Sequence, residues 1–375
     1  MKITKIILRN LRVPLKHPYS LSRAYGVQEI TSNIIAEIHT DEGIVGWGES
    51  DPWPAFTGDT DLSVMAILEH LICPSLIGMD PTNINSIHNH MDTILKGNNT
   101  IKACIDVACH DILGKKLNVS VSELLGGRVR ESIKCFWAVG GNTPHETAEE
   151  ILKIKEQGFW GCMIKIGTDY KNDINRTIAA RDAVGDEFPL IADANQGWDV
   201  DTAIAYGRGV EKANLLFYEQ PVKYYDVIGL AKVKNNVPMA VSADEGITTI
   251  QDAKSLIEAR ACDYFSIKIS KMGGIKPAVR ICEYAEHYGI KLFFNSMLEQ
   301  GITQAASFHV ALTVNNILLS TGHSFFSTLR LKGDVTDFCD WTENGNTKFS
   351  GKTGLGLEIN FRNLEEFTIN RTEIK

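Results

Sequence analysis

The sequence lacks long apolar runs and an excess of positive charge. No stretch approaches the roughly 18 consecutive apolar residues that a membrane helix needs, and residues 1–10 have neither the apolar core nor the small-residue cleavage site of a secretion signal. With 38 Lys and Arg against 46 Asp and Glu, the formal charge of −8 offers no general basic surface for nucleic acid. We therefore expect a cytoplasmic protein with neither a membrane nor a nucleic-acid partner.

Paired cysteines and glycine-rich nucleotide loops are also missing. The eight cysteines occur without a CxxC pair, a pattern that in a cytoplasmic chain favours reduced, buried thiols over disulfides or a zinc site. No GxGxxG loop follows a strand-like run, which argues against a dinucleotide-binding sheet. A chain of 375 residues with 44% hydrophobic and 22% charged residues is typical of a globular protein with two domains or one enlarged barrel.

The first 125 or so residues predict an α+β unit. Residues 2–14 alternate apolar and polar side chains, and two strand-like runs within residues 32–49 flank a turn at 41–43. Residues 99–117 then place apolar side chains at close to helical spacing. An antiparallel sheet followed by a helix is the expected result.

From about residue 132 the chain repeats an apolar run, a loop and an amphipathic helix. The runs cover residues 133–139, 162–167, 189–195, 215–221, 238–245, 264–270, 291–297 and 316–322. Eight such units at about 25-residue spacing are what a (β/α)8 barrel requires. We predict that barrel in preference to a doubly wound sheet, which seldom repeats so evenly.

Five charged residues stand at the carboxyl ends of successive runs: Lys165, Asp193, Glu219, Asp244 and Lys268. In a barrel these ends meet at the mouth where active sites form. Three carboxylates facing one cavity repel unless a cation neutralises them, and hard oxygen ligands suit Mg²⁺ best, with Mn²⁺ as a substitute. The alternative is that each carboxylate caps the helix that follows it.

The two lysines flank the carboxylates from either side. A lysine within an apolar strand is desolvated, which lowers its pKa and allows a neutral amine to act as a base. Two such lysines can move a proton between two faces of one carbon; structural ion pairs with the carboxylates are the alternative. Lys271 lies three residues beyond Lys268, so strand alternation turns it away and predicts a surface position.

Short motifs run through the chain in a specific order: GWGE (46–49), KACIDVACHDILGKKL (102–117), LLGG (124–127), KIG (165–167), DANQGW (193–198), EQP (219–221), ADEG (243–246) and IKISKMGGI (267–275). In this order and spacing the chain resembles the enolase superfamily, in its muconate-lactonizing-enzyme subgroup, over nearly its whole length. The resemblance implies a capping domain with lid loops at 1–125, a barrel with the catalytic residues at 126–320, and a segment at 321–375 that returns to the capping domain.

The resemblance also implies a chemistry. Asp193, Glu219 and Asp244 match the three Mg²⁺ ligands, and Lys165 and Lys268 match the opposed acid/base lysines, which remove the proton alpha to a carboxylate to give an enediolate. Reprotonation from the opposite side inverts the centre. The expected partners are a small carboxylate substrate and, as in many members of the family, further copies of the chain.

Two departures from the subgroup's pattern bear on the substrate. The Lys-x-Lys pair common on the second strand is Met163-x-Lys165 here, which removes one cation from the cavity. The eighth strand reads LSTGHSFF (319–326) in place of the Asp-x-Asp with which dipeptide epimerases hold a free ammonium, whereas SMLEQGI (296–302) is close to the amide-binding seventh strand. An N-substituted amino acid is therefore the expected substrate.

Substrate contacts are expected from the two lid loops, 20–26 and 52–58, and from the ends of the last two strands. Arg23 could instead be simply solvated, and Trp53 and Phe56 could instead pack their own loop. His323 could instead cap a helix at the surface. Asn195 and Glu245 adjoin metal ligands and are expected to orient them. The predicted substrate contacts are Arg23, Tyr25, Trp53, Phe56, Met297, Glu299, Thr321 and His323.

Racemisation or epimerisation of an N-acyl amino acid, a dipeptide or a proline-like betaine is the leading hypothesis. A dehydratase or a cycloisomerase would use the same enediolate with a different exit. The third hypothesis is a protein that is not an enzyme: a metal-binding relative that has lost catalysis. Met163 in place of the usual lysine would then be the first sign of that loss.

Overall fold

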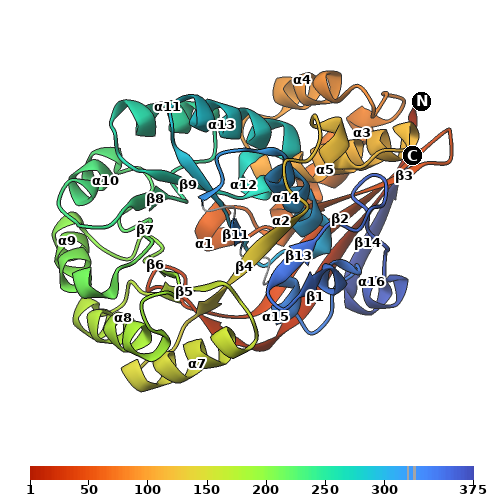
Figure 1. Cartoon of the computed structure of the whole chain (residues 1–375). Helices are drawn as coiled ribbons and strands as arrows, with labels where there is room; N and C mark the ends of the chain where they lie inside the picture. Colours follow the sequence, from red (N-terminus) through yellow and green to blue (C-terminus); the bar gives the residue numbers. More distant parts are fainter. Residues whose placement is uncertain (319–320, 324–326) are drawn as a thin grey trace.

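The computed structural model describes residues 1–318, 321–323 and 327–375, without the side chains of 321–323 and 327. An antiparallel sheet with its own helices lies beside a parallel α/β barrel (Figure 1). Both ends of the chain lie at the antiparallel sheet, far from the barrel (Figure 1).

The antiparallel sheet has the order β14-β1-β2-β3. The predicted first strand and the turn at 41–43 are confirmed, although residues 6–11 are all buried rather than alternating. The last strand of the chain pairs with the first, Ile6 opposite Ile374. The sheet therefore joins the two ends of the chain. Its strands are β1 (Ile3–Ser20), β2 (Val27–Thr40), β3 (Val45–Ser50) and β14 (Thr368–Ile374).

Helices pack on this sheet around a separate apolar core. The predicted helix 99–117 is confirmed as α5, which is buried on most sides and lies against β3. The glycines of GWGE allow that approach, because a Cβ at Gly48 would lie 1.8 Å from the Cys104 carbonyl oxygen. The helices are α1 (Pro54–Thr57), α2 (Asp61–Ile67), a π-helical turn (Leu68–Ile72), α3 (Cys73–Leu76), α4 (Ile84–Ile94), α5 (Asn99–Leu117) and α6 (Val121–Leu124).

The described part of the barrel contains eight parallel strands in chain order. Each pairs with the next, and the eighth pairs with both the seventh and the first. The predicted (β/α)8 architecture is confirmed. The strands are β4 (Ser132–Val139), β5 (Gly161–Lys165), β6 (Leu190–Asp193), β7 (Phe217–Glu219), β8 (Val241–Ala243), β9 (Tyr264–Ile267), β10 (Lys291–Phe294) and β11 (Thr321–His323).

Helices follow each strand and form an outer ring (Figure 1). Helices α7 to α11 begin at side-chain N-caps. At Thr143 the side chain accepts the Glu146 N–H, and the Glu146 carboxylate accepts the Thr143 N–H. The helices are α7 (Pro144–Glu156), α8 (Tyr170–Val184), α9 (Val200–Gly209), α10 (Val227–Lys234), α11 (Ile250–Glu258), α12 (Ile269–Met272), α13 (Ile275–His287), α14 (Gly301–Thr313) and α15 (Ser327–Arg330).

The remaining elements are short, and all but one belong to the C-terminal segment after α15. They are a 3₁₀ turn (Glu211–Ala213) between α9 and β7, a 3₁₀ turn (Phe338–Trp341), β12 (Thr342–Glu343), β13 (Asn346–Lys348) and α16 (Phe361–Phe367). β13 runs antiparallel to β4. All eight cysteines are free, seven of them buried and Cys339 partly exposed. Among the described helices, none has the length and apolar character that crossing a bilayer requires.

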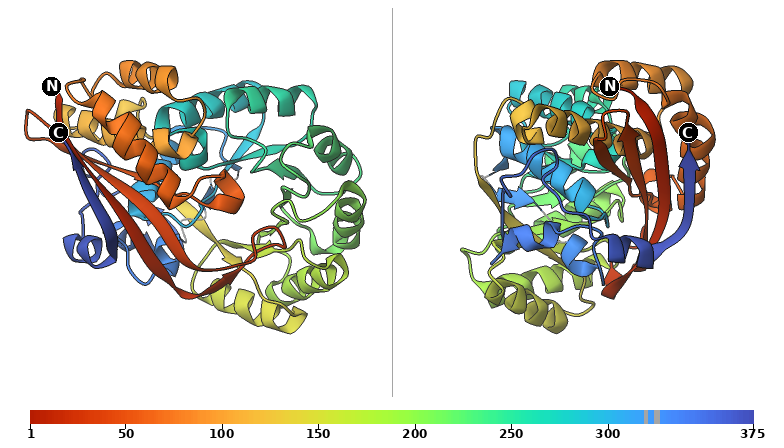
Figure 2. Two further views of the ribbon diagram at one scale, coloured as in Figure 1. Left: turned by 180° about the vertical axis from the view of Figure 1, so that it is seen from behind. Right: turned by 90° about the vertical axis from the view of Figure 1, so that its right-hand side faces the viewer.

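The β1–β2 hairpin carries the first lid loop to the barrel mouth (Figure 2, left). There Ser22 Oγ donates to the Asn195 carbonyl at 3.2 Å, and the Arg23 N–H donates to the Gly167 carbonyl at 3.3 Å. The second lid loop leaves β3 beside Glu49, which accepts the Gln300 and Thr303 N–H groups at the start of α14. Both lid loops thus start from segments anchored to the barrel.

Candidate active site

The five charged residues predicted from the repeat lie together at the carboxyl ends of consecutive barrel strands. Lys165, Asp193 and Glu219 are the last residues of β5, β6 and β7 and stand opposite one another in register. Asp244 and Lys268 directly follow β8 and β9. All five side chains are buried, so they form one water-poor ring of charge in the order Lys, Asp, Glu, Asp, Lys.

Helix capping does not account for the three carboxylates. The N-caps of α9, α10 and α11 are Asp199, Asp226 and Thr249, whose side chains accept the helix N–H groups. Each stands five to seven residues after a ring carboxylate. The three carboxylates of the ring therefore do not cap these helices.

The two lysines each bond to one carboxylate. Lys165 Nζ lies 2.5 Å from Asp193 Oδ2, and Lys268 Nζ lies 2.6 Å from Asp244 Oδ2. Burial alone would lower the pKa of both lysines, but the adjacent aspartates outweigh it, so the pKa of each is raised. The expectation of a lowered pKa was therefore wrong for both, because it counted desolvation without the partner charge.

The predicted surface position of Lys271 is also wrong. The predicted surface residue is only 2% exposed, and its Nζ contacts Asp244 Oδ1 at 2.6 Å, the Asp244 carbonyl at 2.5 Å and the Ser266 carbonyl at 3.0 Å. Strand alternation fails here because β9 ends at Ile267 and α12 begins at Ile269. One helical turn brings residue i+3 back to the same side. Burial lowers the pKa of this lysine.

Glu219 is the least neutralised member of the ring. Its Oε1 accepts from Asn295 Nδ2 at 3.0 Å, whereas its Oε2 has no partner among the described residues. Burial, together with the charges of Asp193 and Asp244, raises the pKa of Glu219 to about 8. A hard cation would relieve this repulsion, so the chemistry of the oxygen donors fits Mg²⁺.

The described side chains do not form a finished metal cage. In residues 1–318, 321–323 and 327–375, no three His, Cys, Asp or Glu side chains converge in a metal-binding arrangement. Asp193 and Asp244 instead each turn an oxygen to a lysine. A cation at the three carboxylates would therefore compete with Lys165, Lys268 and Lys271 for these oxygens.

A second layer of polar side chains supports the ring. The Asn195 N–H donates to Asp193 Oδ1 at 2.8 Å, and Asn195 Nδ2 donates to Glu245 Oε1 at 3.2 Å. Burial raises the pKa of Glu245 to about 7, with Asp244 adding to the effect. Asn195 and Gln196 both have positive φ, 40° and 64°, a strained conformation that often accompanies functional sites.

Tyr25 from the first lid loop reaches into this second layer. Its hydroxyl donates to Glu245 Oε1 at 2.7 Å and accepts from Gln196 Nε2 at 2.7 Å. The ring of Tyr25 packs against two aromatics of the second lid loop, at centroid distances of 5.5 Å to Trp53 and 5.8 Å to Phe56. Phe56 in turn lies over Lys268, with 4.2 Å between Nζ and the ring centroid.

The other predicted substrate contacts are dispersed. Arg23 is exposed and donates to the Thr168 carbonyl at 3.0 Å. Met297 and Glu299 are buried in the β10–α14 turn, where Glu299 Oε2 accepts the Met297 N–H at 2.6 Å. Thr321 and His323 have their backbone in β11, but their side chains lie outside the described residues, as does the whole of Ser320.

Met163 lies on the same strand as Lys165, two residues earlier, and is fully buried in the barrel core. Its neighbours in register are Ala138 and Ile191. The position that would carry a second lysine is thus part of an apolar layer beneath the charged ring.

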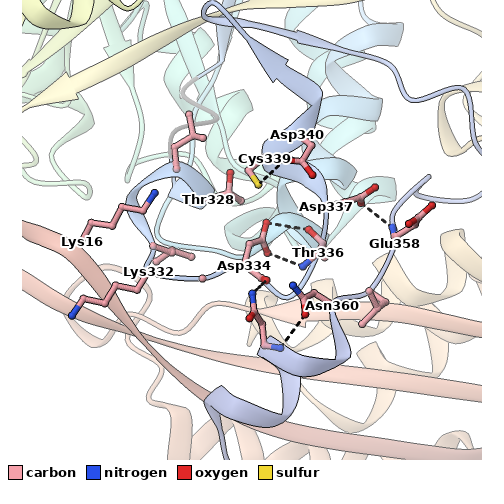
Figure 3. A pocket seen from close by; sticks show the side chains of 15 residues that line it. Lys16, Thr328, Lys332, Asp334, Thr336, Asp337, Cys339, Asp340, Glu358 and Asn360 are labelled. Atoms are coloured by element: carbon pink, nitrogen blue, oxygen red, sulfur yellow. Dashed lines mark hydrogen bonds between the residues drawn. The ribbon is translucent and has the colours of Figure 1, made fainter.

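Two cavities help to place the site. One of about 690 Å³ is lined by Phe56, Glu245, Lys271 and the loops around Gly97 and Thr248, and so adjoins the charged ring. Another of about 450 Å³ lies in the C-terminal segment (Figure 3) and is lined by none of the predicted site residues. Its carboxylates Asp334 and Asp337 already accept main-chain N–H groups. The chemistry therefore belongs to the barrel mouth.

Asn295 and Gln196 were not predicted as site residues, and Lys271 was predicted at the surface. Asn295 had a usable signal, because it follows Lys268 by 27 residues and so continues the spacing of the other strand ends. Lys271 required the end of β9 to be known to one residue. Gln196 and its bond to Tyr25 join segments 171 residues apart, which no local pattern indicates.

Comparisons with known proteins agree with this architecture. Residues 146–363 match the family model described as enolase C-terminal domain-like, and residues 3–126 match the N-terminal domain of mandelate racemase / muconate lactonizing enzyme. An N-succinyl-L-Arg/Lys racemase from Bacillus cereus is 35% identical over 98% of both chains. Its crystal structure superimposes with a TM-score of 0.96 over all of both chains.

Two further relatives differ in reaction. A dipeptide epimerase from Cytophaga hutchinsonii, solved with Mg and the dipeptide D-Ala-L-Val, has a TM-score of 0.94 at 29% identity over all of both chains. Muconate cycloisomerase 1 of Pseudomonas putida is 29% identical over 98% of this chain and 97% of its own. Racemases, epimerases and cycloisomerases thus share this chain's fold from end to end.

Proposed function

The chain belongs to the enolase superfamily, in the mandelate racemase / muconate lactonizing enzyme family, and is an enzyme of the isomerase type; on that premise we propose that it racemises or epimerises an N-substituted amino acid or dipeptide. The observation that carries the proposal is the buried ring at the barrel mouth, with Lys165 and Lys268 at its two ends and three carboxylates between them. Two opposed amines are what inversion of a carbon requires.

We assign the metal to the carboxylates of the ring. Asp193, Glu219 and Asp244 would hold Mg²⁺, as the complex of the Cytophaga relative with Mg supports. When bound, Mg²⁺ supplies positive charge opposite the second negative charge that develops on the substrate carboxylate. Mn²⁺ offers similar hard-ligand chemistry as a substitute.

The lysines perform the proton transfer. One of them, in its neutral form, takes the proton alpha to the substrate carboxylate, and the other, as an ammonium ion, returns a proton to the opposite face. The raised pKa of Lys165 comes from its contact with Asp193. Drawing that carboxylate away from Lys165 removes the main cause and makes the neutral amine accessible.

The substrate class follows from what the site offers and from the relatives. The chain has no Asp-x-Asp on its eighth strand to hold a free ammonium, and the relatives include an N-succinyl-L-Arg/Lys racemase and a dipeptide epimerase. Arg23, Trp53, Met297, Glu299, Thr321 and His323 remain proposed substrate contacts. The division at residues 125 and 320 and self-association of the chain also remain proposals.

Isotope exchange tests the reaction directly. The protein is incubated with Mg²⁺ and single enantiomers of N-succinyl and N-acetyl amino acids and of dipeptides in D₂O, and α-deuteration is followed by NMR. We expect deuterium in both the starting and the inverted isomer of at least one substrate. Absence of exchange across the whole panel would contradict the proposal.

Lysine variants test the two-base assignment. Lys165→Ala and Lys268→Ala should each lower racemisation by at least about 10³-fold, because each removes the acid/base group on one face. Exchange from one enantiomer should survive in one variant and from the opposite enantiomer in the other. Full racemase activity in both variants would show that the lysines are not the bases.

A cycloisomerase is the second candidate, because a muconate cycloisomerase is similar over the whole chain. It would use the same enediolate but form or open a ring rather than invert a centre. Incubation with muconate and its lactone distinguishes the two, since a cycloisomerase interconverts them and a racemase leaves both unchanged.

A further inference from the structure

The second lid loop places an aromatic ring on one of the two proposed catalytic lysines. Phe56 belongs to α1, and its ring centroid lies 4.2 Å from Lys268 Nζ. An ammonium over the face of a ring at this distance is held by the ring's negative face. Lys268 is 6% exposed, so little water competes for the ammonium on this side.

Lys165 has no equivalent cover among the described side chains. Among the described residues, no aromatic ring face lies over Lys165. The cations that do lie over ring faces there are Arg128, Lys134, Lys155, Lys171, Lys268 and Arg330. The ion-pair partner of Lys165 is Asp193, and the buried Tyr19 of β1 also lies close enough to help raise its pKa, although no ring face covers the amine. The second lid loop therefore covers the amine of Lys268 with an aromatic ring but does not cover that of Lys165.

The position of Phe56 is set by contacts that lead back to the barrel. Its ring packs on Tyr25 at 5.8 Å and on Trp53 at 6.2 Å. Tyr25 is in turn bonded to Glu245 and Gln196 at 2.7 Å each. Glu245 directly follows Asp244, the carboxylate that pairs with Lys268. The lid aromatics and the Lys268 end of the ring thus form one connected unit.

We propose that Phe56 is a positioning residue for Lys268, through which the second lid loop supports proton transfer at one face of the substrate carbon and leaves the Lys165 face largely unaffected. The aromatic ring of Phe56 fixes the direction of the Lys268 ammonium group and excludes water from it. This inference rests on the proposed function, since it assigns the two faces to the two lysines.

Face-selective exchange in D₂O tests the inference. Lys268→Ala and Lys165→Ala first identify which enantiomer each lysine deprotonates. Phe56→Leu keeps apolar bulk and removes the ring, so exchange from the Lys268 enantiomer should fall about tenfold, whereas exchange from the Lys165 enantiomer should stay within about threefold. Phe56→Tyr keeps the ring and should restore most of the lost rate. Equal losses on both faces, or no recovery with Phe56→Tyr, would overturn the inference.

A measurement without substrate or metal separates this inference from the proposed function. Trace acetylation with acetic anhydride, read out by mass spectrometry, gives the relative reactivity of Lys268 and Lys165 in the metal-free protein. Phe56→Leu should raise the labelling of Lys268 several-fold relative to Lys165, because the ring no longer covers its amine, and Phe56→Tyr should not. An unchanged ratio would overturn the inference even if the enzyme racemises its substrate. If the wild-type protein exchanges no substrate proton but the ratio changes as expected, the contact stands and the proposed function fails.

Discussion

Single buried charges decide how the charged ring behaves, and Lys271 is the clearest case. Asp244 receives the ammonium groups of both Lys268 and Lys271, each at 2.6 Å. Lys271 also satisfies two main-chain carbonyls, those of Asp244 and Ser266. A residue expected at the surface is therefore part of the support of a proposed metal ligand.

Replacing Lys271 should be costly even without metal. In Lys271→Met, two carbonyl oxygens and one oxygen of Asp244 lose a buried donor, and removal of one partner from a buried pair typically costs about 3 kcal/mol. Urea unfolding measures the loss. Lys254→Met is the matched control, because Lys254 pairs with Glu258 at the exposed surface at 3.6 Å and should change stability by less than about 0.5 kcal/mol. Equal effects would contradict the structural role.

At the scale of elements, α14 joins the barrel to its surroundings. Glu49 accepts N–H groups at the start of the helix, and Asp334 accepts the Gly301 N–H at 3.0 Å. Further along, His309 Nδ1 accepts the Ser122 N–H at 3.2 Å and its Nε2 donates to the Leu355 carbonyl at 3.1 Å. The imidazole is thereby held neutral, and burial lowers its pKa to about 4.

This histidine should make stability depend on pH. Its folded pKa lies below the unfolded value of about 6.5, so the unfolded chain binds the proton more readily. The stabilising contribution is therefore present above pH 6.5 and is lost as the pH falls towards 4, by about 2 kcal/mol between pH 7 and pH 5. His309→Asn retains an acceptor for Ser122 but does not titrate. Urea unfolding at pH 7 and pH 5 measures the loss of stability in each protein. The wild type should lose about 2 kcal/mol more than the variant, and equal losses in the two proteins would contradict the role of His309.

At the scale of the whole molecule, the barrel brings together five charges that lie on five separate strand ends. Burial and repulsion among the three carboxylates destabilise the folded state, as the raised pKa of Glu219 indicates. A bound cation should therefore stabilise the entire chain, since it favours the folded state alone. Glu219 is the sharpest probe because its Oε2 is buried without a partner in the described part of the chain.

Mg²⁺ at about 100 times its dissociation constant should stabilise the protein by about 2.7 kcal/mol, seen as a rise in Tm by scanning calorimetry. Glu219→Gln should abolish this rise. It should also unfold at a higher temperature than the metal-free wild type, because it removes a carboxyl group whose ionisation is disfavoured in the folded state but not in the unfolded chain. Glu258→Gln, at the exposed end of α11, is the control that keeps the full response to Mg²⁺. A full response in Glu219→Gln would place the metal elsewhere.

Most of the fold and of the site could be predicted from the repeat and from the order of the motifs. Eight apolar runs at an even spacing of about 25 residues are what a (β/α)8 barrel requires, and a doubly wound sheet seldom repeats so evenly. Residues at the ends of those runs then have to meet at the mouth, whatever the details of packing. Lys165, Asp193, Glu219, Asp244 and Lys268 could be placed together for that reason, and the helical stretch predicted over residues 99–117 coincides with α5.

The amino-acid sequence by itself thus determined the barrel, the five strand-end charges and the class of chemistry, since these depend on local periodicity and on residue type. Only the tertiary structure decided the lysine pKa values, which depend on 2.5–2.6 Å contacts with aspartates, and the burial of Lys271, which depends on where one strand ends. The lid contacts of Tyr25 and Phe56 also belong to the tertiary structure. They join residues about 200 positions apart, and no local pattern encodes which distant partner a side chain meets.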